Sequence, residues 1–126
     1  MIRIVIWVLV GLLIGLAAGY LITANYLLET IPKGYVSVTA INKSGNKIKT
    51  LILHHEKGSI EMNDLAEQES VKLIFKNAGE NAYYLTGEFE NDSTFSSSKE
   101  YVEAGYRLTE IILADTVRSD RSSYWK

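Results

Sequence analysis

Residues 70–90 have the sequence SVKLIFKNAGENAYYLTGEFE, in which apolar and polar side chains alternate on both sides of a polar centre. In a β-strand successive side chains point to opposite faces, so a period of two indicates strands. We predict strands at 70–76 and 82–90, and the residues expected to face inward are Val71, Leu73, Phe75, Tyr83, Leu85, Gly87 and Phe89. The segment 77–81 has the composition of a tight turn, so we expect these two strands to form a β-hairpin.

The same period continues on either side, with polar turns every eight to twelve residues. It predicts further strands at 35–42, 47–56, 59–63 and 106–116, and one or two short strands within 94–102. In the strand predicted at 47–56, Ile48 and Ile52 should face opposite to Leu51 and Leu53. We therefore predict a mostly β domain of seven or eight antiparallel strands, an immunoglobulin-like or transthyretin-like β-sandwich, with a small barrel as the alternative.

The N-terminal part has a different composition. Residues 4–24, IVIWVLVGLLIGLAAGYLITA, carry no charged side chain. As a helix this segment would be ~30 Å long, which matches the ~30 Å hydrocarbon core of a bilayer. Trp7 lies near one end, with Tyr20 and Tyr26 near the other, where aromatic rings favour the membrane interface. We predict one transmembrane anchor helix, and the lipid bilayer as its first partner.

A cleaved signal peptide is the alternative, with Ala17-Ala18-Gly19 as the small-residue cleavage site. The apolar run is longer than the ~7 to 15 residues of a usual signal-peptide core, which favours an uncleaved anchor. The expected organisation is an anchor at 1–30, a linker at 31–34, the β-sandwich at 35–117 and a flexible tail at 118–126. We expect the N-terminus on the cytoplasmic side of the membrane and the domain on the outer side.

Within the helix, Gly11, Gly15 and Gly19 recur at every fourth position and so share one face. Small residues at this spacing let a second helix approach closely. The hypothesis is packing against another helix, either a second copy of the chain or a partner. The alternative is that glycine is simply frequent in membrane helices.

Composition excludes several classes of function. The chain has no cysteine, which removes disulfides, thiolate metal sites and a cysteine nucleophile. Its 13 basic and 15 acidic side chains give a net charge of −2, without the basic stripe that nucleic-acid binding needs. We expect no nucleic-acid partner.

The sequence also lacks a specific catalytic motif. His54 and His55 are adjacent in a predicted strand, so they should point to opposite faces and could not chelate one ion. The carboxylates Glu88, Glu90 and Asp92 suggest a calcium site, but a solvated strand face explains them better. We therefore expect no catalytic residues, no metal and no cofactor, and a protein that is not an enzyme.

Tyrosines instead suggest a recognition surface, and we expect it at Tyr84 with Thr86, at Tyr101 with Tyr106, and at the terminal pair Tyr124 and Trp125. The alternative for these tyrosines is packing in the sheet. The leading hypothesis is a non-enzymatic, membrane-anchored binding or structural module. It would be an accessory subunit of a bacterial envelope assembly, in the inner membrane with its domain in the periplasm, and a homo-oligomer is one option. The alternatives are a membrane-tethered inhibitor or immunity protein, and a secreted ligand-binding sandwich.

Overall fold

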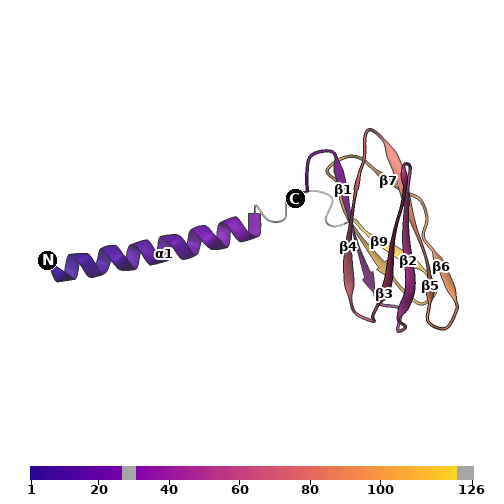
Figure 1. The fold of residues 1–126 in the computed structure, drawn as a ribbon, viewed down its shortest axis with the longest axis horizontal. Helices are drawn as coiled ribbons and strands as arrows, with labels where there is room; N and C mark the ends of the chain where they lie inside the picture. The colour runs from indigo at the N-terminus through magenta and orange to yellow at the C-terminus, as the bar shows by residue number, and fades with distance from the viewer. Residues whose placement is uncertain (27–30, 122–126) are drawn as a thin grey trace. The chain divides into compact units, whose positions relative to one another are not determined.

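The computed structural model describes residues 1–26 and 31–121. The chain divides into two units, Met1–Thr30 and Ile31–Lys126, which are described separately below (Figure 1). The first unit is the helix α1, Ile2–Tyr26, which has no acidic residue in its first turn and no basic residue in its last. The whole apolar segment lies within this one continuous helix, as the sequence predicts.

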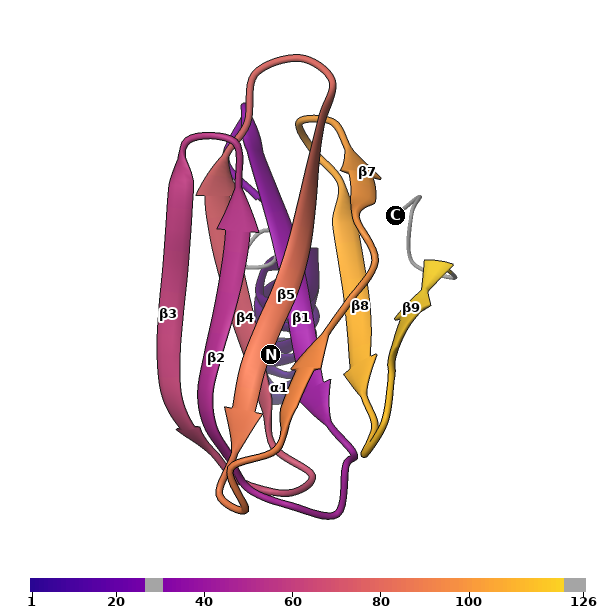
Figure 2. The same ribbon diagram turned by 90° about the vertical axis from the view of Figure 1, so that its right-hand side faces the viewer.

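The second unit contains two β-sheets (Figure 2). The four-stranded sheet has the order β4-β1-β8-β9 and consists of β4 (Ser70–Lys76), β1 (Tyr35–Asn42), β8 (Arg107–Ile112) and β9 (Val117–Asp120). The five-stranded sheet has the order β3-β2-β5-β6, and β7 also pairs with β5. Its members are β3 (Gly58–Leu65), β2 (Ile48–His55), β5 (Asn81–Phe89), β6 (Thr94–Ser96) and β7 (Glu100–Val102).

The strands β4 and β5 lie in different sheets, so the hairpin predicted for 70–90 is wrong. β4 pairs with β1, whereas β5 pairs with β2, β6 and β7. The intervening turn crosses from one sheet to the other and is held by the half-buried side chain of Asn81, whose Nδ2 donates to Asn77 Oδ1 at 2.9 Å. Both strands can keep their apolar residues inward because the two sheets share one core.

Two further details differ from the prediction. The described residues contain nine strands instead of seven or eight: the segment 94–102 holds two strands, as one of the predicted options had it, and β9 follows β8 as a separate strand that was not predicted. One neighbouring pair, β1 with β8, is parallel, so the sheets are mostly and not entirely antiparallel. β9 also extends to Asp120 and thus includes residues that the sequence analysis placed in the tail.

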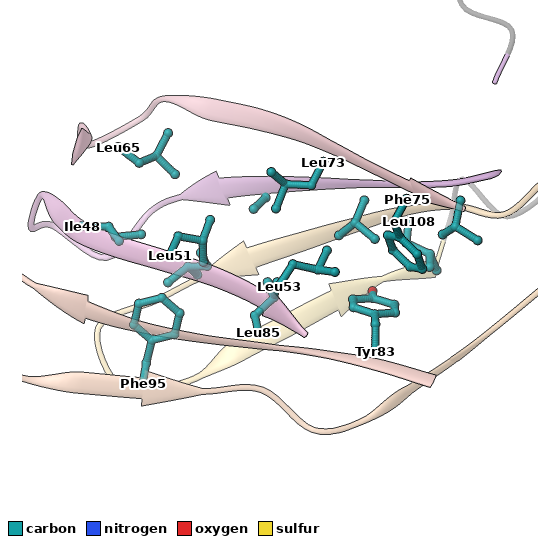
Figure 3. Packing of buried hydrophobic residues seen from close by; sticks show 14 of the residues in the cluster. Ile48, Leu51, Leu53, Leu65, Leu73, Phe75, Tyr83, Leu85, Phe95 and Leu108 are labelled. Carbon is teal, nitrogen blue, oxygen red and sulfur yellow. The ribbon is translucent and has the colours of Figure 1, made fainter. Parts of the chain in front are cut away.

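The hydrophobic core lies between the sheets, and Figure 3 shows side chains from both of them gathered there. The predicted alternation accounts for most of it: Leu73 and Phe75 from β4 are buried, as are Tyr83, Leu85 and Phe89 from β5. Fully buried apolar side chains also come from the other strands, namely Val36, Val38, Ala40, Ile48, Leu51, Leu53, Val102 and Ile112.

Ile48 is the exception to the predicted alternation in β2. It is buried on the same side as Leu51 and Leu53, although the sequence analysis placed it on the opposite face. The pairing of β2 with β5 shifts register between Ile48 and Thr50, which is a β-bulge. A bulge inserts one extra residue, so the side chains before it face the side opposite to the one that uninterrupted alternation predicts.

Candidate functional site

The outer face of the five-stranded sheet carries a regular array of side chains, which we call the outer array. Register fixes its rows, because directly opposed residues on neighbouring strands share a face. Across β3, β2, β5 and β6 the rows are Ser59–His54–Tyr84, then Glu61–Ile52–Thr86–Ser96, then Asn63–Thr50–Glu88–Thr94. The front sheet in Figure 2 presents this face to the viewer. Two predicted recognition residues, Tyr84 and Thr86, therefore lie in the middle of one sheet face.

Contacts between neighbours hold the outer array in place. The imidazole of His54 stacks on the ring of Tyr84 with centroids 4.5 Å apart, and its Nε2 lies 2.8 Å from Thr86 Oγ1. The ammonium group of Lys99 lies 5.9 Å from the Tyr84 ring centroid, within cation–π range. Thr50 donates a hydrogen bond to Asn63 Oδ1 at 3.1 Å. These side chains are therefore positioned before any partner arrives.

An open groove of about 490 Å³ runs over the centre of the outer array. Its lining consists of Thr50, Ile52, Thr86, Gly87, Glu88, Thr94, Phe95 and Ser96. Four of these residues carry hydroxyl groups, but most of the surface that lines the groove is apolar. Beneath the groove, the aromatic ring of Phe95 occupies the space that a side chain at Gly87 would fill. The groove can offer hydrogen bonds and an apolar contact to an uncharged surface.

The carboxylates considered for calcium are paired with lysines instead. Glu88 lies 2.8 Å from Lys49 Nζ, Asp92 lies 3.8 Å from the same ammonium, and Glu90 lies 3.5 Å from Lys47 Nζ. The hydrogen bond from Lys49 lowers the pKa of Glu88. Across the residues that the structure describes, no group of three or more His, Cys, Asp or Glu side chains could hold a metal ion.

His54 and His55 point to opposite faces, as the sequence predicts. His55 lies on the core side, where it stacks on Phe75 with ring centroids 4.8 Å apart. Burial there lowers the pKa of His55. The two imidazoles belong to different surroundings and cannot share a ligand.

The second predicted pair, Tyr101 and Tyr106, lies apart from the centre of the outer array. The rings are 6.3 Å apart in an edge-to-face arrangement. Tyr101 is 47% exposed and donates a hydrogen bond to Glu103, which raises the pKa of its phenol. Both tyrosines line a hollow of about 330 Å³ together with Glu100 and Arg121.

Sequence reasoning missed a buried polar cluster next to this hollow. Glu110 of β8 is completely buried, and accepts hydrogen bonds from the Tyr83 hydroxyl and from Ser119 Oγ. Burial raises the pKa of Glu110, while the two hydroxyls act in the opposite direction. The signal was present in the sequence, because Glu110 alternates with Leu108 and Ile112 and so occupies an inward position.

The predicted helix residues lie along α1. Gly11, Gly15 and Gly19 share one face, and the space beside each of them is open. Trp7 and Tyr20 are exposed near the two ends of the apolar segment. The side chain of Tyr26, and the residues Tyr124 and Trp125, lie outside the described part of the chain.

Among the described residues, one helical stretch, Ile2–Ala24, is long and apolar enough to cross a membrane. A helix of this kind at the N-terminus is consistent with either a membrane anchor or a signal sequence. Over residues 1–26 and 31–121, the chain consists of one apolar N-terminal helix followed by two mostly antiparallel β-sheets.

No protein-family model matches this chain, and no curated protein sequence matches it. A solved structure described as the NMR structure of a protein from Eubacterium rectale is similar to it, with 19% sequence identity and a TM-score of 0.57. The similarity covers 68% of this chain and 88% of that one. At this level of identity, the match is evidence of a shared fold alone.

Proposed function

We propose that this protein is a non-enzymatic binding module, held at a membrane by α1, which serves as an accessory subunit of a bacterial envelope assembly. In this proposal the helix stays in the inner membrane and the β domain lies in the periplasm. The partner is another protein of that assembly, and it binds the outer array. The single observation that carries the proposal is the preorganised face around His54, Tyr84 and Thr86.

Preorganisation favours binding, because ordering a flexible side chain at an interface costs about 0.5 to 1.5 kcal/mol of binding free energy. The stacked and hydrogen-bonded side chains of the outer array have already lost most of that freedom. Two acidic side chains of the outer array already have partners within the chain: Glu88 pairs with Lys49, and Glu61 accepts a hydrogen bond from Asn63. Both features favour a partner surface that is largely uncharged.

For the domain itself, we propose the transthyretin-like type of β-sandwich. In the immunoglobulin arrangement the first two strands lie in the same sheet. Here β1 and β2 lie in different sheets, and each sheet takes its strands from both halves of the domain. The strand order therefore supports the transthyretin-like alternative of the two considered.

Site-specific photo-crosslinking in cells tests the binding face. A photoreactive amino acid replaces Thr86 at the centre of the outer array, and Lys72 serves as the matched control. Lys72 is exposed on β4, on the outer side of the other sheet. We expect a crosslinked protein with the Thr86 probe and none with the Lys72 probe. Equal crosslinking from both positions, or none from either, would contradict the proposed face.

The membrane location has its own test. The chain has no cysteine, so a single Lys72→Cys variant carries one reactive thiol, at an exposed position in β4 outside the outer array. After permeabilisation of the outer membrane, a membrane-impermeant maleimide should label it while the inner membrane is intact. The mass of the purified protein should include residues 1–26. Labelling only after lysis would reverse the orientation, and a mass without the helix would indicate a cleaved signal.

A further inference from the structure

The outer face of the four-stranded sheet, which is the rear sheet in Figure 2, carries mainly basic charges, and we call it the basic face. Register fixes its rows, because directly opposed residues share a face. Across β4, β1, β8 and β9 the rows are Lys76–Tyr35, then Ile74–Ser37–Arg107, then Lys72–Thr39–Thr109–Asp120, then Ser70–Ile41–Ile111–Arg118. Four of these side chains are basic and one is acidic, although the whole chain has a net charge of −2.

Three of the basic side chains, Lys72, Lys76 and Arg118, have no acidic partner within residues 1–26 and 31–121. All three residues are exposed. In contrast, Lys47 and Lys49 beside the outer array each lie within ion-pair distance of two acidic side chains. The charges of Lys72, Lys76 and Arg118 are therefore available to an anionic surface outside the domain.

An exposed apolar side chain lies between the two lysines of β4. Ile74 is 44% exposed, and among the described residues outside α1 the only other large hydrophobic side chain with this degree of exposure is Tyr101. Lysine and arginine attract anionic lipid headgroups, and an apolar group beside them can enter the interfacial region of the bilayer. The chemistry of the basic face therefore fits the surface of an anionic membrane.

The basic face also begins close to the connection with α1. The strand β1 starts at Tyr35, nine positions after Tyr26, the last residue of α1. A segment of that length spans at most about 30 Å. Lys76 is the direct cross-strand partner of Tyr35, so a basic side chain lies where the connecting segment joins the sheet. A membrane that holds α1 therefore keeps the basic face within reach of its headgroups.

We propose that the basic face docks on the anionic lipid headgroups of the membrane that holds α1. The inference rests on the proposed membrane anchor, but not on the binding of a protein to the outer array. The core lies between the two sheets, so the basic face and the outer array point in opposite directions (Figure 3). Docking in this way leaves the outer array open to a partner.

Docking through a few charges is reversible. Salt screens such an attraction over about 8 Å at physiological ionic strength. The thiol of the Lys72→Cys variant therefore still reacts with a water-soluble maleimide, and the labelling test of membrane location is unaffected.

Fluorescence quenching in proteoliposomes tests the docking. Ser70→Cys places a single thiol on the basic face, at the end of β4 away from Lys76. Ser96→Cys places one at an exposed position in the outer array. Each thiol carries an environment-sensitive fluorophore, and the full chain is reconstituted with nitroxide-labelled lipid into vesicles of phosphatidylcholine, alone or in an about 7:3 mixture with phosphatidylglycerol.

We expect the probe at residue 70 to be quenched at least twofold more strongly in the anionic vesicles than in the uncharged ones. High salt should remove the difference, because it screens the attraction. The probe at residue 96 should be quenched weakly and equally in both kinds of vesicle.

Two pairs of lysines provide a matched comparison in the Ser70→Cys chain. Lys72→Gln/Lys76→Gln should remove the extra quenching. Lys43 and Lys57 are exposed in connections between strands, outside the basic face. Lys43→Gln/Lys57→Gln removes the same charge and should retain the extra quenching.

Flotation of the vesicles after an alkaline wash reports on the helix anchor separately. A chain that floats, but whose probe at residue 70 is quenched equally in both kinds of vesicle, keeps the anchor and overturns the docking. Loss of the extra quenching in both lysine variants would also overturn it. A chain that does not float overturns the anchor and the docking together. A protein crosslinked in cells to the photoreactive residue at position 72 would assign the basic face to a protein partner instead.

Discussion

The phenol of Tyr83 donates a hydrogen bond to the carboxyl group of Glu110, and this contact joins the two sheets inside the core. Tyr83 belongs to β5 and Glu110 to β8, and both side chains are completely buried. A buried carboxyl group costs free energy in its ionised form, because the core solvates charge poorly. The burial of Glu110 therefore makes the stability of the domain depend on the protonation of this residue.

We predict that Glu110 lowers the stability of the domain as the pH rises. Its pKa is raised in the folded chain, so the folded state retains a proton that the unfolded state has released. The free energy of unfolding should fall from pH 4.5, the ordinary pKa of the group, up to the raised value. A Glu110→Gln variant should lack this fall. Urea denaturation of the full chain in detergent, followed by tryptophan and tyrosine fluorescence at pH 5 and 8, measures the difference.

The control for this prediction is Glu56→Gln, because Glu56 is exposed in the turn after β2. That variant should keep the pH dependence of the unmodified chain. A Glu110→Gln variant with the same decline would mean that another group causes it.

A second prediction concerns Gly87 and Phe95. A Cβ atom at Gly87 would lie 2.3 Å from the Phe95 ring and 2.7 Å from the carbonyl oxygen of Thr50. Gly87→Ala should therefore destabilise the domain by about 1 to 3 kcal/mol, which is usual for overpacking. In a Phe95→Leu background the same substitution should cost less, although the Thr50 carbonyl remains in the way. A double-mutant cycle by urea denaturation gives the coupling, and independent effects would contradict this packing.

Asn42 is predicted to be a structural residue at the end of β1. It is completely buried, and its side-chain amide donates to the carbonyl oxygens of Asn46, Leu65 and Ala66 at 2.8, 3.1 and 3.2 Å. Asn42→Ala would remove these donations, of which the one to Leu65 is buried, and also the oxygen that accepts from Ser44, at an expected loss of about 2 to 3 kcal/mol. Thermal unfolding measures this loss.

Asn91 is the matched control for Asn42. It stands in the same Asn-x-Ser pattern and accepts hydrogen bonds from Ser93 at 3.1 and 2.6 Å, but it is exposed. Asn91→Ala should change stability by less than about 0.5 kcal/mol, as surface substitutions usually do. Equal losses for the two variants would show that the buried amide of Asn42 is not the source of the effect.

The glycine face of α1 yields a further prediction about association in the membrane. If Gly11, Gly15 and Gly19 pack against a second helix, Gly15→Leu should abolish chemical crosslinking of the protein in native membranes. Leu13→Ile is the control, because residue 13 lies two positions away, on a different side of the helix. Unchanged crosslinking in the Gly15→Leu variant would remove this role for the glycines.

Local patterning accounted for the elements and for most of their buried faces. The uncharged apolar run at 4–24 predicted the helix, because an apolar segment of that length is stable in lipid as a spanning helix. The alternation in the strands predicted at 70–76 and 82–90 correctly placed Phe75 and Tyr83 on the inward side, because neighbouring residues in a strand must face opposite ways. It also separated His54 from His55.

These patterns could not predict which strands lie beside each other. Alternation records which side of a strand is apolar but not which strand lies beside it, so the assignment of β4 and β5 to different sheets was missed. The bulge that turns Ile48 inward depends on the pairing of β2 with β5. The outer array likewise exists only through cross-strand register, which brings His54 beside Tyr84. Periodicity is a property of each segment alone, whereas the pairing of strands depends on the core that all of them bury together.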